Sequence, residues 1–148
     1  MRILFDTSVL VAGLVETHPM HSRAFPWLEK AQTGEIELLV STHSLAELFS
    51  VLTTLPLNPK ISPATAQQLI DEVVEISAAQ VELSAADYQE VVSSMATKGL
   101  AGGVIYDALI AKAAQKSGAD QLMTFNERDF RRVWPDGREL ITKPPHPH

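Results

Sequence analysis

The chain has 148 residues, of which 45% are hydrophobic and 20% are charged, and it contains no cysteine. This length and apolar content suit a single globular domain, and the lack of cysteine excludes disulfides, zinc bound by thiolates and thiol nucleophiles. The formal net charge of −6 argues against general electrostatic attachment to nucleic acid. No stretch approaches the roughly 20 apolar residues of a membrane span, so we expect a soluble, cytoplasmic protein.

The opening stretch predicts a buried strand that leads directly into a helix. Ile3 to Phe5 form a short apolar run, Asp6 ends it, and a second apolar run begins after Thr7 and Ser8. Ligands of open α/β sheets bind outside the carboxyl ends of the strands, so Asp6 is well placed for chemistry. Asp is also a preferred N-cap residue. Both interpretations of Asp6 remain open from this stretch alone.

The next segments predict a helix, a second strand and a third helix. Residues 18–33 predict a helix that Pro26 kinks or delays. The apolar run from Ile36 to Val40 predicts a second strand, and Ser41 or Thr42 can cap the helix that follows. The buried stripe of that helix is expected to consist of Leu45, Leu48, Phe49 and Leu52.

Glu47 lies beside this apolar stripe. A carboxylate among apolar neighbours is costly without a partner, and no Lys or Arg follows before Lys60. A metal ion or a distant basic side chain would then have to compensate Glu47. The alternative is that Glu47 lies at the boundary of the buried face and that its carboxylate reaches water.

The middle of the chain predicts a loop, a helix and a third strand. Three prolines fall within residues 55–63, and Ser62 before Pro63 is a favourable helix start. The helix continues to Ile76 with an apolar face. A brief third strand is expected over residues 80–83.

Two further helices carry clear sequence signals. Ser84, with Asp87 three residues later, predicts a capping box and a helix that ends near Lys98. The segment VIYDALIAKAAQKSG predicts a helix that ends at its glycine. Asp107 in its first turn either gains from the helix dipole or supplies another carboxylate to a site. The apolar face of this helix is expected to comprise Ile105, Tyr106, Leu109, Ile110, Ala113 and Ala114.

The last strong pattern is a fourth strand over residues 121–124, followed by the sequence FNERDF. Asn126 and Asp129 follow this strand end as Asp6 follows the first one. If NERDF forms a helical turn, Asp129 reaches the same side as Asn126. The alternative is a surface ion pair between Asp129 and Arg132.

Alternating strands and helices with short connections predict an α/β fold, with a parallel sheet covered by helices on both faces. We expect a domain over residues 1–142, with an edge strand over residues 139–141 and a disordered tail over residues 143–148. Several acids lie near the ends of elements and are expected to meet at one edge of the sheet. These acids are Asp6, Glu47, Asp107 and Asp129.

A cluster of carboxylates has a chemical rationale. Carboxylates within a few ångströms repel one another and raise their own pKa values, unless a divalent cation keeps them ionised. Oxygen ligands suit Mg²⁺ or Mn²⁺. A bound ion lowers the pKa of its water and stabilises charge on a phosphoryl oxygen, which points to phosphodiester hydrolysis.

Four stretches in this order resemble the PIN-domain ribonucleases, and among them the toxins of VapBC-type toxin-antitoxin pairs. The stretches are ILFDTSVLVA, HSLAELFSVL, YDALIAKAA and LMTFNERDF. The resemblance implies a five-stranded parallel sheet and an RNA substrate, with Mg²⁺ or Mn²⁺ held by Asp6, Glu47 and Asp107. Many members have an aspartate where this chain has Asn126, so the fourth acidic position passes to Asp129.

The resemblance also implies supporting residues and partners. Thr7, Ser8 and Thr124 match polar positions of the family, where they support the site. A cognate antitoxin and a homodimer are expected, and the helices near residues 42–54 and 63–76 are candidates for a groove or a dimer face. The sequence shows no aromatic-rich platform for RNA bases.

Two other functions are compatible with parts of the sequence. A phosphatase with Asp6 as nucleophile is one, but haloacid-dehalogenase-type enzymes carry a second aspartate two positions on, where this chain has Ser8. A catalytically weak or inactive binding module with the same fold is the other, and Asn126 is the only indication of it. Dependence on Mg²⁺ or Mn²⁺ separates a nuclease from a module without a functional site.

Overall fold

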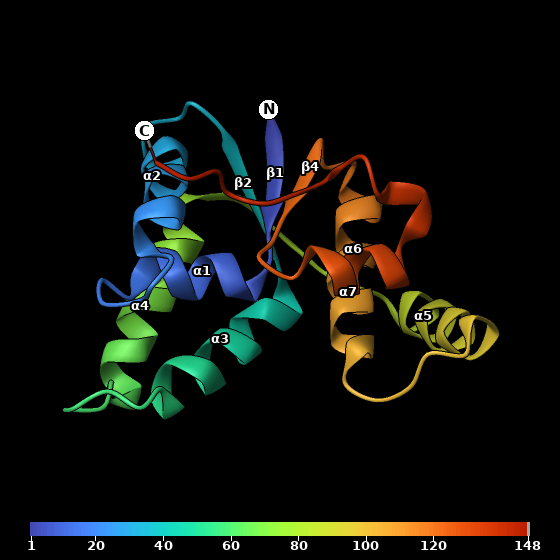
Figure 1. The fold of residues 1–148 in the computed structure, drawn as a ribbon, viewed down its shortest axis with the longest axis horizontal. Coiled ribbons are helices and arrows are strands. Elements are labelled where there is room, and N and C mark those ends of the chain that lie inside the picture. Colours follow the sequence, from blue (N-terminus) through green and yellow to red (C-terminus); the bar gives the residue numbers. More distant parts are fainter. Residues whose placement is uncertain (148) are drawn as a thin grey trace.

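The computed structural model describes residues 1–147 and contains a five-stranded parallel sheet with the order β3-β2-β1-β4-β5 (Figure 1). The strands are β1 (Arg2–Phe5), β2 (Glu37–Ser41), β3 (Ser77–Val81), β4 (Gln121–Met123) and β5 (Ile141–Thr142). The helices are α1 (Thr7–Leu14), α2 (His21–Gln32), α3 (Thr42–Thr54), α4 (Pro63–Ile76), α5 (Ala85–Lys98), α6 (Val104–Ser117), α7 (Glu127–Val133) and the short 3-10 helix η1 (Pro135–Gly137). The predicted α/β fold is therefore confirmed.

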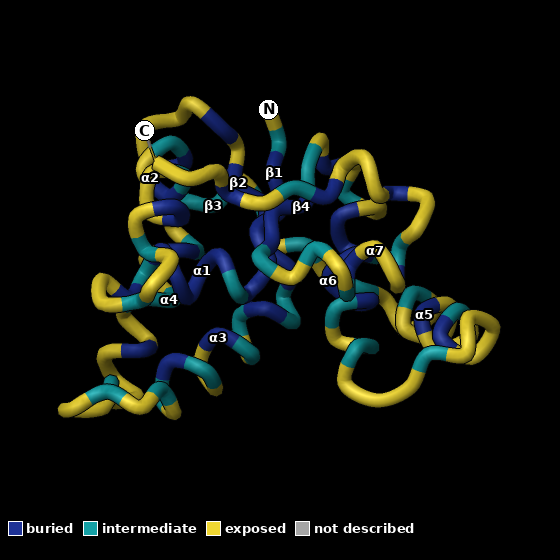
Figure 2. The backbone as a smooth tube through the Cα atoms, in the orientation of Figure 1, coloured by how far each residue is buried: buried dark blue, intermediate teal, exposed yellow. Residues whose placement is uncertain are grey.

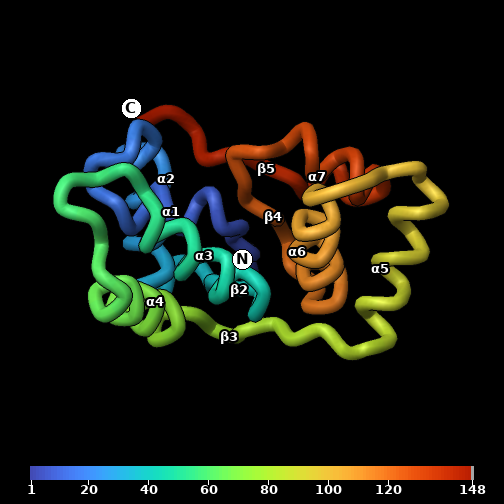
Figure 3. The backbone as a smooth tube through the Cα atoms, turned by 90° about the horizontal axis from the view of Figure 1, so that it is seen from below, coloured from blue at the N-terminus to red at the C-terminus, as the bar shows by residue number. Residues whose placement is uncertain are grey.

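The sheet separates two hydrophobic cores. Successive side chains of a strand face opposite sides, so Ile3 and Phe5 pack with α1 to α4, whereas Leu4 packs with α5, α6 and α7. Figure 2 shows the resulting band of buried backbone through the central strands. Figure 3, turned by 90°, shows the same division into two helical groups. None of the helices within residues 1–147 is long and apolar enough to cross a membrane.

The predicted helix starts are confirmed by their caps. Ser41 is the N-cap of α3, and the Ser62 side chain accepts a hydrogen bond at the start of α4. Ser84 and Asp87 form the complete capping box of α5. The helix predicted over residues 18–33 begins only at His21, as a delayed start. Polar side chains therefore fix where α3, α4 and α5 begin, because they satisfy backbone N–H groups that have no partner inside the helix. Helices α2, α6 and α7 begin without a hydrogen bond from a capping side chain.

Two edge strands differ from their predicted positions. The third strand begins at Ser77, directly after α4, instead of at residue 80, and it ends at Val81. The fifth strand comprises Ile141 and Thr142 instead of residues 139–141, because the Leu140 N–H closes a turn onto the Gly137 carbonyl. Edge strands have only one neighbouring strand, so a continuous apolar run does not mark their limits.

Two aromatic side chains that were predicted to be buried are exposed instead. Phe49 of α3 is 42% exposed, and Tyr106 of α6 is 51% exposed. Phe49 lies at the rim of a hollow between α3 and α4, and Tyr106 stacks against His43. Helical spacing assigned both residues to the buried face, but it does not show how wide that face is.

The segment after residue 142, predicted to be a disordered tail, has no helix or strand over residues 143–147, and His148 lies outside the described residues. Pro144 is nevertheless buried. Its carbonyl accepts hydrogen bonds from Arg23 Nε at 3.0 Å and Arg23 Nη2 at 2.6 Å. Arg23 itself is only 9% exposed, so this contact compensates a buried guanidinium.

Helices α1 and α2 approach closely at Gly13. A Cβ atom at this position would lie 2.5 Å from Leu28 Cδ1 and 3.1 Å from Leu28 Cγ. Leu28 is buried at 6% exposure and cannot move into solvent without leaving the core. The contact between the two helices therefore depends on the missing side chain.

We expect Gly13→Ala to lower the free energy of unfolding in urea denaturation. Overpacking costs about 1–3 kcal/mol, which outweighs the gain of up to about 1 kcal/mol in helix propensity. Gly103→Ala is the matched control, because Gly103 has a negative φ of −66° and the nearest atom to its Cβ, in Tyr106, is 4.0 Å away. Equal stability of the two variants would contradict the close approach at Gly13.

Candidate active site

The fold brings four acids from distant parts of the chain to one edge of the sheet. Asp6 directly follows β1, and Glu47 lies in α3, which follows β2. Asp107 is in the first turn of α6, and Asp129 is in α7, after β4. The pKa of Asp107 is raised to about 7, first by burial and then by the charges of Asp6, Asp129 and Glu47. The other three acids are thus close enough to Asp107 for their charges to act on it.

Asp6 is the most constrained of these acids. It is 2% exposed, and its Oδ1 accepts hydrogen bonds from Ser8 N at 2.6 Å, Ser8 Oγ at 2.6 Å and Val9 N at 3.3 Å. Thr124 Oγ1 donates to Oδ2. Burial raises the pKa of Asp6, although these hydrogen bonds act in the opposite direction. Asp6 therefore caps α1 and also contributes charge to the cluster, so the two interpretations of it are compatible.

The two hydroxyls that bind Asp6 also fix the loop after β4. Ser8 Oγ accepts the Phe125 N–H at 3.1 Å, and Thr124 Oγ1 accepts the Asn126 N–H at 2.8 Å. Thr124 is fully buried. The backbone of this loop is therefore held at a defined position relative to the carboxylate of Asp6.

Glu47 has a partner that the sequence reasoning missed. His43 Nε2 lies 3.3 Å from Glu47 Oε2, one helical turn earlier in α3. The His43 ring stacks on Tyr106, with ring centroids 5.2 Å apart and an interplanar angle of 6°. The i, i+4 spacing of His43 and Glu47 could have predicted their contact, because such residues lie on the same face of a helix. The stacking of His43 on Tyr106 could not be predicted in this way, because the two residues belong to different helices.

Asp129 forms the surface ion pair that was one of the two predicted alternatives. Its Oδ1 lies 3.3 Å from Arg132 Nη1, and the two side chains are 45% and 49% exposed, so this pair contributes about 0–1 kcal/mol. Its charge also acts on Asp107. Asn126 occupies the N-cap position of α7, but its side chain makes no capping hydrogen bond there.

The donor set fits a hard divalent cation in kind and in charge. Asp107 has no hydrogen bond or ion pair among residues 1–147 that would compensate its charge, and the hydroxyl of Thr7, the residue after Asp6, is buried without a hydrogen-bond partner in the same range. Carboxylate and hydroxyl oxygens suit Mg²⁺ or Mn²⁺. Within the described chain, no three acidic or histidine side chains are gathered tightly around one point. Glu47 and Asp129 are partly exposed, and their carboxylates would have to move closer to the other acids to share one ion.

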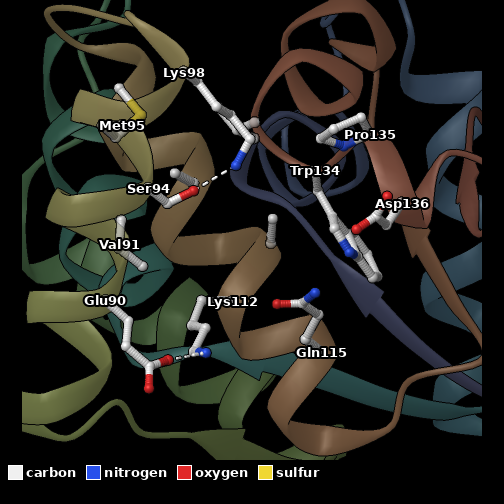
Figure 4. A pocket seen from close by; sticks show the side chains of 13 residues that line it. Glu90, Val91, Ser94, Met95, Lys98, Lys112, Gln115, Trp134, Pro135 and Asp136 are labelled. Carbon is white, nitrogen blue, oxygen red and sulfur yellow. Dashed lines mark hydrogen bonds and ion pairs between the residues drawn. The ribbon is translucent and has the colours of Figure 1, made fainter.

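A separate pocket lies between α5, α6 and η1 (Figure 4). Its volume is about 240 Å³. Trp134 and the Lys112–Glu90 ion pair line it. None of the four acids is among its lining residues, so the carboxylate chemistry does not belong to this pocket.

The sequence matches the family described as PIN domain over residues 3–134. Ribonuclease VapC27 of Mycobacterium tuberculosis is 35% identical over 115 residues, which cover 78% of this chain and 78% of the relative. Ribonuclease VapC40 of the same species is 34% identical over 128 residues, which cover 86% of this chain and 87% of the relative.

Solved structures with the same fold are more distant in sequence. VapBC2 from Rickettsia felis, bound to a DNA fragment from its promoter, matches with a TM-score of 0.67 and 23% identity over 97% of this chain and 98% of that chain. FitAcB from Neisseria gonorrhoeae matches with a TM-score of 0.64 and 20% identity over 95% of this chain and 96% of that chain. At this identity the likeness shows the fold.

We expect Asp107→Asn to raise the thermal stability of the metal-free protein at pH 8. The pKa of Asp107 is about 7 in the folded state and 3.8 as its ordinary value, so between these values the folded state binds more protons and stability falls as the pH rises. The variant has no carboxyl group that ionises at this position, so its stability does not fall in this way. Its advantage should therefore shrink as the pH is lowered from 7 to 4, and Mg²⁺ should raise the Tm of the original chain more than that of the variant.

Asp87→Asn is the control, because the pKa of Asp87 is shifted in the opposite direction to that of Asp107. Its hydrogen bond with Lys116 and its backbone bond to Ser84 lower the pKa of Asp87 to about 2. Asp87 therefore stabilises the fold above its ordinary pKa of 3.8, and this contribution is lost as the pH falls toward 2. Asp87→Asn should lower the Tm at pH 8. The same pH response for both variants would show that Asp107 does not lie in a crowded acidic cluster.

Proposed function

The chain belongs to the PIN-domain family, and on that premise we propose that it is a Mg²⁺- or Mn²⁺-dependent endoribonuclease that acts as the toxin of a toxin-antitoxin pair. The ribonucleases VapC27 and VapC40, at 35% and 34% identity, support the reaction. The observation that carries the metal dependence is the raised pKa of Asp107, caused by burial and by three neighbouring carboxylates. A bound cation is the chemistry that would keep such a set ionised.

Asp6, Glu47, Asp107 and Asp129 would hold the ion, which supplies a water of lowered pKa and stabilises charge on the phosphoryl oxygen. The roles of the chain's own residues follow from their contacts. Ser8 and Thr124 orient Asp6, and His43 lies against Glu47. Arg132 holds the outer acid Asp129. Thr7 and Asn126 are supporting residues beside the acids.

The alternative functions predict different behaviour. An inactive binding module would keep the fold without Mg²⁺ or Mn²⁺ dependence. A phosphatase would use Asp6 as nucleophile, yet one oxygen of Asp6 already accepts three hydrogen bonds and the other accepts one from Thr124. A carboxylate engaged in this way is a weak nucleophile, and its geometry favours a positioning or metal-binding role.

The proposed partners are a cognate antitoxin and a second copy of the chain. The antitoxin is supported by the likeness to VapBC2 of Rickettsia felis. The dimer is supported by a largely apolar hollow of about 530 Å³ between α3 and α4, lined by Phe49, Pro63, Ala64, Gln67 and Ile70. Exposed apolar surface of this kind marks interaction sites.

We expect Asp6→Asn and Asp107→Asn to abolish cleavage of cellular RNA in Mn²⁺, because a neutral amide binds a hard cation poorly. The loss should exceed the roughly 10–100-fold effect of residues that only orient metal ligands. Chelator should abolish cleavage by the unaltered chain. The control is Asp71→Asn, which changes an exposed acid on α4. Mapping of the cut ends measures the reaction, and full cleavage by either site variant would refute the assignment.

The dimer has a separate test in light scattering. Phe49→Arg places a charge in the α3–α4 hollow and should convert a dimer to a monomer at micromolar concentration. Val92→Arg is the matched control, because Val92 is 56% exposed on α5 and lies outside the hollow. A monomeric unaltered chain would exclude the dimer. Co-purification from the native operon tests the antitoxin.

A further inference from the structure

A further pocket, with Glu47 in its lining, lies between α1, α3 and the loop after β4. Its volume is about 390 Å³, within the range of about 300–1,000 Å³ found for small-molecule sites. Glu47 belongs both to the acidic cluster and to the rim of this pocket. The remaining wall is mostly apolar and includes Val11, Met20, Val51, Leu55 and Phe125. An apolar group bound in this pocket would therefore lie next to the Glu47 carboxylate.

Two of the polar residues that line this pocket, His18 and Asn126, have hydrogen-bonding groups available for a ligand. His18 Nδ1 accepts the Met20 N–H at 3.0 Å, and burial lowers the pKa of His18, so its neutral ring has Nε2 as the protonated nitrogen. The Asn126 side chain has no hydrogen-bond partner among residues 1–147. Its amide offers both a donor and an acceptor. This combination suits the edge of a planar heterocycle, which presents donors and acceptors in one plane.

The aromatic wall of the pocket has a fixed position relative to the acids. The Phe125 N–H donates to Ser8 Oγ, which in turn donates to Asp6. The Arg23 guanidinium lies 5.4 Å from the centroid of the Phe125 ring and supports it by a cation–π contact. A group bound against Phe125 would thus be positioned with respect to Asp6.

We propose that this pocket binds one base of the RNA, next to the phosphodiester that is cleaved, and that Asn126 recognises the edge of this base. The inference rests on the proposed function and names its specificity site. Single-stranded RNA is recognised by unstacked bases that contact aromatic rings and form hydrogen bonds through their edges. With a net charge of −6, base contacts supply affinity that general electrostatic attraction cannot.

The surroundings of the pocket favour RNA over an apolar protein segment. Phe125 and Asn126 also line an adjoining hollow on α7, together with Arg128, Arg131 and Arg132 and the acids Glu127 and Asp129. Arg131 pairs with Glu127, and Arg132 pairs with Asp129. Guanidinium groups bind phosphates well, so Arg128 and the partly exposed guanidinium groups of these two pairs offer the RNA backbone a contact next to the bound base.

The test begins with binding, independently of cleavage. The four ribonucleoside 5′-monophosphates are titrated into the full chain, and amide signals are followed by NMR. We expect at least one nucleotide to shift the signals of Phe125 and Asn126. Val51→Phe fills the pocket and should weaken this binding about tenfold or more, as base stacking contacts do when they are lost. Val92→Phe, the same change at an exposed valine of α5, is the control.

The second measurement is the base preference at the cut in a random-sequence RNA. Asn126→Ala removes both the donor and the acceptor and adds no charge beside the acids, so it should weaken the base preference at one position beside the cut, and Val51→Phe should weaken the same preference. Thermal unfolding verifies that both variants fold. This readout also works for Asn126→Ala if Val51→Phe does not fold.

The outcomes separate this inference from the proposed function. Cleavage with no nucleotide binding in the pocket, and with an unchanged base preference in the variants, overturns the inference and leaves the nuclease. Nucleotide binding that Val51→Phe removes, without any RNA cleavage, keeps the base pocket and removes the nuclease. Binding of an apolar antitoxin peptide in the pocket, with no nucleotide binding, identifies a protein side chain as the occupant and also overturns the inference.

Discussion

The hydrogen bonds around the Asp6 carboxylate are the constraint on which the rest of the site depends. This buried group joins the end of β1, the first turn of α1 and the loop after β4 through Ser8, Val9 and Thr124. Each bond lowers the cost of burying a carboxylate. The same hydroxyls bind the backbone of Phe125 and Asn126. One side chain therefore fixes the helix start, the neighbouring loop and the position of its own charge.

The four acids have unequal support, which makes the cluster asymmetric. Asp6 is held by hydrogen bonds, Glu47 lies against His43 and Asp129 lies against Arg132. Asp107 has only carboxylates among the groups that shift its pKa. Crowding of like charges in a half-buried place opposes folding, and native proteins keep such groups where function requires them. Asp107 therefore marks the place in the site where the chain itself supplies no positive charge to balance the carboxylates.

The sequence predicts the interior of this fold better than its periphery. The apolar runs of β1, β2 and β4 are long enough to recognise because central parallel strands are buried on both faces. Polar caps located the starts of α3, α4 and α5. The edge strands β3 and β5 lack this signal. Asp6, Asp107 and Asp129 were predicted as site residues because they lie near the ends of elements, and Glu47 because it lies beside the apolar stripe of α3. The contact of His43 with Tyr106 and the exposure of Phe49 depend on how separate helices pack, which spacing within one helix does not encode.

The contact between Arg23 and Pro144 extends the core beyond the last strand. The guanidinium of Arg23 is buried, donates twice to the Pro144 carbonyl and supports the Phe125 ring. If the chain were shortened to the end of β5, two donors of a buried cation would lose their acceptor, and charge-assisted hydrogen bonds of this kind contribute about 1.5–3 kcal/mol. The smallest fragment that retains the native surroundings of Phe125 therefore extends past Pro144, although the sequence likeness to the family ends at residue 134.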